Sequence, residues 1–178
     1  MKHVLLTLAV LLSGCVRLGI DATATDHHEY DLPNSPSVNA MIPVTVSGPL
    51  GAGIAQALES AGKPTNSHID SVDLSAVITS ARLATDTTLA GVYECKIVLA
   101  SDTASLDISD YQLTDADRKQ GAIDLPLDHA TLDELRPLAN GSNPRVVTTF
   151  MVNPSQLTAH KATVDLVVDA SANVKASL

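Results

Sequence analysis

Histidine and carboxylate side chains stand together near the N-terminus of this 178-residue chain, in the run His27-His28-Glu29 between Asp26 and Asp31. Imidazole and carboxylate groups are common ligands of divalent metals, so this run could hold a metal ion. The surrounding residues are polar, however, and ordering adjacent side chains of a flexible segment around one ion costs conformational entropy. We therefore expect a solvated linker at this position and no metal site.

Five aspartates between residues 101 and 121 suggest calcium chemistry, because carboxylate oxygens suit that hard ion. They are Asp102, Asp107, Asp110, Asp115 and Asp117. An EF-hand loop that began at Asp115 would need a ligand at its fifth position and glycine at its sixth, where this chain has Lys119 and Gln120. A loop site of another kind, for calcium or a small ligand, stays open beside the alternative of exposed, solvating aspartates.

The other candidates for chemistry lack the sequence context that their chemistry requires. Cys95 alternates with apolar residues, which predicts a buried and unreactive thiol. The segment Gly48-Pro-Leu-Gly51-Ala-Gly53 has neither the dinucleotide-binding nor the Walker spacing, so we expect a crossover of small residues. His68, His129 and His160 accompany no G-x-S-x-G motif. The sequence therefore nominates no catalytic residue.

The first fifteen residues have the organisation of a secretory signal. Lys2 precedes an apolar run from Val4 to Leu12 that only Thr7 interrupts, and Leu12-Ser13-Gly14-Cys15 follows directly. A transmembrane helix needs about 20 apolar residues, so this shorter run is typical of a cleaved signal.

The four residues Leu12-Ser13-Gly14-Cys15 resemble the lipobox of bacterial lipoproteins. This resemblance implies that the Cys15 thiol carries a fatty acid such as palmitate and that cleavage before Cys15 removes residues 1–14, leaving 164 of the 178 residues. Val16 stands where an aspartate would resemble an inner-membrane retention signal, so the resemblance implies the outer membrane. With Cys15 acylated, Cys95 has no partner for an intramolecular disulfide.

Composition excludes some partners. The formal charge is −9 and the aromatic content is 2%, which disfavours both phosphate backbones and base stacking. We expect no nucleic-acid binding. The lipid, and not the surface charge, must then hold the protein at the membrane.

Beyond the signal, we expect a flexible tether over residues 15–40, which are rich in polar residues and proline, and one domain over residues 41–178. Apolar and polar residues alternate in several segments of the domain, as in half-buried strands. A parity change near Thr79 predicts a β-bulge, and Pro43 predicts an edge strand or a strand start. The expected strands cover residues 41–46, 69–83, 91–100, 106–108, 123–127, 145–152 and 163–178. Short helices are expected at 54–62 and from Thr131, the second ending at Pro137 unless it kinks there and continues to a stop at Gly141.

These elements predict a mainly β fold, an antiparallel β-sandwich with one or two short helices. The order of Ile69-Asp-Ser-Val-Asp-Leu-Ser-Ala-Val-Ile, then Leu89 to Ser101, then Ile123-Asp-Leu-Pro-Leu and a short helix resembles uncharacterised bacterial lipoproteins with an immunoglobulin-like β-sandwich domain. This resemblance covers residues 41–178 and implies a fold without a function.

From the sequence we expect a membrane-anchored lipoprotein of the bacterial cell envelope that acts as a non-catalytic structural or protein-interaction module. Its partners would be the membrane, through acylated Cys15, and an envelope protein, and it would need no cofactor. The alternative is a calcium- or small-ligand-binding surface domain, and a hydrolase or enzyme accessory ranks last.

Overall fold

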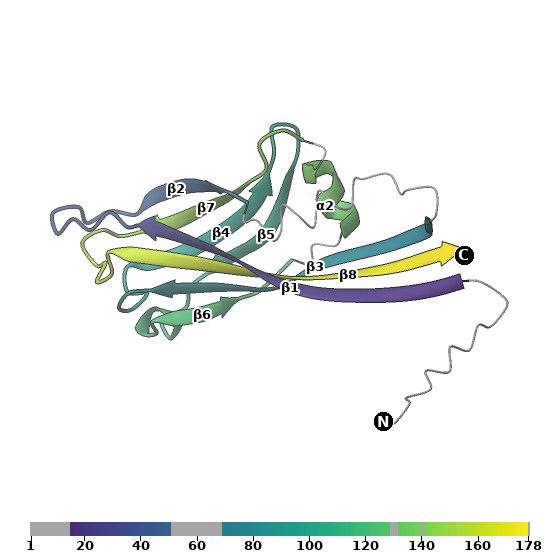
Figure 1. Ribbon diagram of the computed structural model, residues 1–178. Helices are drawn as coiled ribbons and strands as arrows, with labels where there is room; N and C mark the ends of the chain where they lie inside the picture. Colours follow the sequence, from purple (N-terminus) through teal and green to yellow (C-terminus); the bar gives the residue numbers. More distant parts are fainter. Residues whose placement is uncertain (1–14, 51–68, 129–131, 140, 178) are drawn as a thin grey trace, which may run out of the picture.

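Two antiparallel sheets form the fold in the computed structural model, which describes residues 15–50, 69–128, 132–139 and 141–177 (Figure 1). The strands are β1 (Cys15–Asp31), β2 (Ile42–Pro49), β3 (Ile69–Thr85), β4 (Val92–Ala100), β5 (Ser105–Gln112), β6 (Ala122–Leu125), β7 (Arg145–Val152) and β8 (Lys161–Ser177), and the helical elements are η1 (Asp117–Lys119) and α2 (Leu132–Ala139). One sheet has the order β1-β8-β3-β6 and the other β2-β7-β4-β5. The predicted antiparallel β-sandwich is confirmed.

Alternating side chains from both sheets fill the core. On β7 every second residue from Val146 to Val152 is buried, and on β8 Val164, Leu166 and Val168 are buried while their neighbours are more exposed. The register of β3 against β8 shifts between Ile78 and Ser80, which confirms the predicted bulge. The shift places Ile78, Ala81 and Leu83 all in the core, although they differ in parity.

Proline acts as expected in β2 but not in α2. β2 lies at the edge of its sheet, as Pro43 predicted. The helix does not end at Pro137 but continues through it to Ala139, so of the two expected ends the later one, before Gly141, is correct. Leu135 and Leu138 are both almost fully buried, and this burial offsets the hydrogen bond that proline removes. The predicted helix at 54–62 lies outside the described residues.

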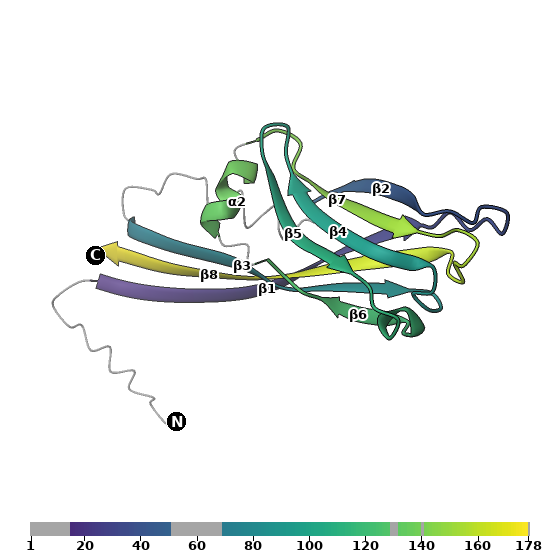
Figure 2. The same cartoon turned by 180° about the vertical axis from the view of Figure 1, so that it is seen from behind.

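Three strands of 17 residues each extend well beyond the sandwich. β1, β8 and β3 continue side by side past the ends of the shorter strands (Figures 1 and 2). Residues 15–21, 69–75 and 171–177 form what we call the ribbon. β6 pairs with β3 only from Ala81 to Ala84, so the ribbon has three strands among the described residues.

The predicted flexible tether over residues 15–40 is wrong. Residues 15–31 form strand β1, in which each residue has a register partner on β8, from Cys15 opposite Ser177 to Asp31 opposite Lys161. The connection that follows is also attached, since the Leu32 N–H donates to the His160 carbonyl at 2.8 Å. The folded domain therefore begins before residue 41. Polar residues at buried positions of β1 had masked its strand periodicity.

Candidate functional site

Cys15, the predicted acylation site, is the first residue of β1 and therefore lies at the end of the ribbon. Its backbone is in register with Ser177, near the end of β8. The other lipobox residues, 12–14, lie outside the described residues, as does the predicted signal peptide over residues 1–14. An acyl group on Cys15 would thus be attached to a paired strand and not to a flexible tether.

Polar pairs across β1 and β8 hold the two strands in register on the outer face of their sheet. Thr23 Oγ1 donates to Asp169 Oδ1 at 2.6 Å, and His27 Nδ1 lies 2.5 Å from Asp165 Oδ1. Lys161 pairs with Glu29 in the same row. Exposed pairs contribute at most about 1 kcal/mol each, so this row fixes the register more than it stabilises the fold.

A cleft of about 740 Å³ lies between the edge strands of the two sheets, lined by residues 26–31 and 46–50. Asp26, His28 and Tyr30 of β1, together with Leu50, are the buried residues of its wall, each less than 10% exposed. The His28 ring stacks on Tyr30 with centroids 6.1 Å apart, and Tyr30 packs edge-on against Phe150. Burial raises the pKa of Tyr30, more than its hydroxyl contact with Thr148 lowers it. Sequence reasoning missed this cleft, and its only signal was the alternation of Asp26, His28 and Tyr30.

The imidazole of His28 is packed tightly in this cleft. Its Nε2 lies 3.0 Å from Asp26 Oδ2, yet the approach lacks the alignment of a hydrogen bond and the atom has no other hydrogen-bond partner among the described residues. Gly48 of β2 leaves room for the ring, since a Cβ there would lie 3.0 Å from His28 Nδ1. Ser47 of β2 is exposed and also lines the cleft.

The run His27-His28-Glu29 cannot converge on one metal ion, because β1 sends successive side chains to opposite faces. His27 and Glu29 are exposed on the outer face, whereas His28 and Asp26 are buried on the inner face. Within the described ranges no group of three or more metal-ligating residues occurs. The expected solvated linker is equally wrong, since the run belongs to a paired strand.

The five aspartates of the calcium hypothesis do not converge on one site either, because they are divided among several contacts with basic side chains and a turn. Lys96 Nζ lies 3.0 Å from Asp107 Oδ2 and 3.3 Å from Asp110 Oδ2. Arg145 Nη1 lies 3.3 Å from Asp102 Oδ1, and Arg118 pairs with Asp115. Their spacing in sequence therefore reflects cross-strand and turn contacts.

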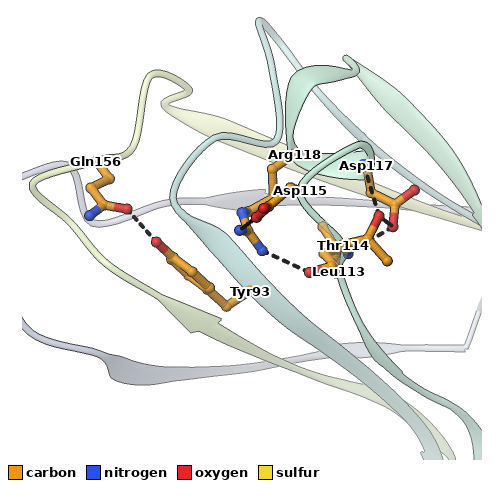
Figure 3. Close-up of polar contacts among 7 residues, drawn as sticks. All are labelled: Tyr93, Leu113, Thr114, Asp115, Asp117, Arg118 and Gln156. Atoms are coloured by element: carbon orange, nitrogen blue, oxygen red, sulfur yellow. Dashed lines mark hydrogen bonds and ion pairs between the residues drawn. The ribbon is translucent and has the colours of Figure 1, made fainter.

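Asp117 closes a capping box at the turn before β6 (Figure 3). Its Oδ2 accepts hydrogen bonds from the Thr114 backbone N–H at 2.8 Å, the Thr114 hydroxyl at 2.6 Å and the Tyr111 hydroxyl at 3.0 Å. The Thr114 hydrogen bonds lower the pKa of Asp117, and the contact with Asp117 raises the pKa of Tyr111.

An arginine links this turn to β4. The Arg118 guanidinium stacks over the Tyr93 ring at 4.5 Å from its centroid, and its Nη1 donates to the Leu113 carbonyl at 2.8 Å (Figure 3). The Tyr93 hydroxyl donates to Gln156, near the start of the segment that leads into β8. Residues that looked like calcium ligands in the sequence are thus neighbours of a structural cation–π contact.

Cys95 lies in the core with a fully buried side chain, which confirms the prediction for this residue. It is in register with Phe150 of β7. Burial, with smaller effects of Glu94 and Asp110, raises the pKa of its thiol to about 12. The thiol is therefore protonated and unreactive at neutral pH. In the predicted glycine crossover, Gly48 packs beside His28, and Gly51 and Gly53 lie outside the described residues.

Comparison with known proteins does not assign the chain to a family. No protein-family model and no curated protein matches the chain. A structure of Nora virus aligns at 12% identity with a TM-score of 0.26, covering 94% of this chain and 61% of that one. A structure of infectious bursal disease virus (Gx strain) aligns at 9% identity with a TM-score of 0.17, covering 90% of this chain and 41% of that one. Both TM-scores are too low to indicate a shared fold.

No helix in the described part of the chain is long and apolar enough to cross a membrane.

Proposed function

We propose that this chain is a lipid-anchored protein of the bacterial cell envelope, and that its β-sandwich is a non-catalytic structural or protein-interaction module. The observation that carries the proposal is the sequence Leu12-Ser13-Gly14-Cys15 behind Lys2 and a short apolar run. Cys15, which the lipobox resemblance makes the mature N-terminus, belongs to strand β1. The acyl group would then sit at the tip of a ribbon whose base belongs to the core.

An interaction role fits the chemistry of the described residues better than catalysis or calcium binding does. The Cys95 thiol is buried, and the aspartates of residues 101–121 are engaged by lysine, arginine or capping contacts. By contrast, β1 offers a long sheet edge to a partner. We therefore favour a contact surface over a reaction site.

The proposal places the protein at the outer membrane with a protein partner of the envelope. Cell fractionation tests the anchor: wild type and Cys95→Ala are expected with the outer membrane, and Cys15→Ser is expected to leave it. Cys95→Ala is the matched control because it removes the other cysteine. Equal membrane association of Cys15→Ser and wild type would contradict the proposal.

The interaction half of the proposal has its own test. The acylated protein, used as bait on envelope extracts, should retain a defined protein partner and release no stoichiometric metal or small ligand. Release of bound calcium or a small molecule would instead favour a ligand-binding surface domain.

A further inference from the structure

Of the edge strands in the described part of the chain, β1 is the one that is neither short nor interrupted by proline or a register shift. Edge strands are usually blunted by these features or by charged side chains, and of these β1 has only the charges, including buried Asp26. β2 contains Pro43 and Pro49, β6 has four residues, and the β4–β5 register shifts between Ile97 and Val98. β1 instead has 17 residues in unbroken register with β8 and no proline.

An edge of this kind presents unpaired backbone N–H and C=O groups to any strand that can lie beside it. Along its 17 residues, β1 pairs on one side with β8 and ends the sheet order on the other. The cleft beside residues 26–31 lies at this same edge. A strand that pairs with this edge must place favourable side chains opposite those of β1.

The sequence of β1 is complementary to itself in the antiparallel direction. If two copies pair about Ala24, Arg17 lies opposite the partner's Asp31, and Asp21 lies opposite the partner's His27. Thr23 then faces the partner's Thr25, which is a favourable cross-strand pair. A centre at Thr25 would instead oppose Asp21 to the partner's Glu29.

We propose that two copies of this chain pair antiparallel through β1, centred on Ala24, so that their four-stranded sheets become one continuous sheet. This pairing identifies a second copy of the chain as the partner of the proposed interaction module, and it rests on that proposed function. The two Cys15 ends would then be roughly 60 Å apart at ~3.3 Å per residue. Two acyl anchors at that separation suit a dimer that lies along the membrane.

A single cysteine at the centre of the pair tests the register. Opposed residues of antiparallel strands have Cα atoms about 4.5–5.5 Å apart, within disulfide range. Ala24→Cys in the full-length protein, extracted from membranes and mildly oxidised, should give a disulfide-linked dimer. In the control Ala22→Cys, the two cysteines are about four residues out of register and should not link. Buried Cys95 adds no background.

Equal linking at both positions, no linking at Ala24→Cys, or linking of Ala24→Cys to a different protein would overturn the proposal. A charge exchange tests the side-chain pairing: Arg17→Asp should lower the dimer yield severalfold, and adding Asp31→Arg should restore it. Intact mass of the same samples reports fatty acid on Cys15 independently. Acylated monomer would therefore refute the pairing alone, and unacylated dimer would refute the anchor alone.

Discussion

The hydroxyl of Tyr30 lies 3.2 Å from Thr148 Oγ1, and this buried contact joins β1 of one sheet to β7 of the other. The Tyr30 ring also packs edge-on against Phe150, two residues further along β7. β1 is therefore fastened to the core at its C-terminal half, while its N-terminal half continues into the ribbon. This attachment allows one strand to serve the core and carry the predicted anchor.

Replacing Tyr30 by Phe tests that attachment. We expect a loss of about 1 kcal/mol in the free energy of unfolding, because the buried Thr148 hydroxyl would lose its partner. Urea denaturation measures the change. Tyr93→Phe is the matched control, since its hydroxyl bonds an exposed Gln156 and should matter less. A Tyr30→Phe variant with the same free energy of unfolding as wild type would show that the contact does not stabilise the fold.

Hydrophobic alternation predicted most strands because most of them bury one face. The strand β8 and the bulge of β3 followed from that period alone. β1 was missed because Asp26 and His28 occupy buried positions, where a sequence pattern requires apolar residues. The pairing partner β8 lies more than 100 residues further along the chain, so the contact that makes these residues part of a strand is not visible in the local sequence.

The candidate site also combines features that the local sequence predicts with features that depend on contacts between distant segments. The burial of Cys95 was predicted from local sequence, since an alternating strand is a local feature. Acylation of Cys15 stays a prediction from a local signal motif. The cleft was not predicted, because it joins residues 26–31 to residues 46–50 across two sheets. The aspartates suggested a calcium site for a related reason. Their partners Lys96 and Arg145 lie on other strands, so the local sequence does not show these contacts.

The Cys95 thiol should be unreactive in the folded protein. Its pKa of about 12 and full burial leave almost no thiolate at neutral pH. A thiol-specific chromogenic reagent should find no reactive thiol in the native acylated protein and one per chain in urea. Fast labelling of the native protein at Cys95 would contradict the burial, and a second thiol in urea would indicate unacylated Cys15.

The capping carboxylate of Asp117 should make stability depend on acid pH. Its folded-state pKa is lowered from 3.8, so its contribution is complete above that value and is lost as the pH falls through the lower folded value. Asp117→Asn should therefore be less stable than wild type at pH 7, with the difference shrinking below about pH 3.8. Urea titrations at several pH values measure it. A difference that is constant with pH would exclude this role.

Calcium should leave the stability unchanged, because Lys96 already occupies the space between Asp107 and Asp110. A site of about 10⁻⁴ M affinity would, at about 10 mM Ca²⁺, add about 2.7 kcal/mol and raise Tm by more than about 5 °C. We expect the same Tm in calcium and in magnesium at equal ionic strength. A calcium-specific increase would revive the ligand-binding alternative.

Fatty-acid attachment at Cys15 is the most direct test of the proposed function. Cells that express wild type, Cys95→Ala or Cys15→Ser are fed an alkyne-bearing fatty acid, and each purified chain is assayed for the label. We predict label on wild type and Cys95→Ala and none on Cys15→Ser, with Cys15→Ser also retaining its N-terminal residues. Label on Cys15→Ser equal to that on wild type, or an unlabelled wild type, would contradict a lipid anchor at this residue.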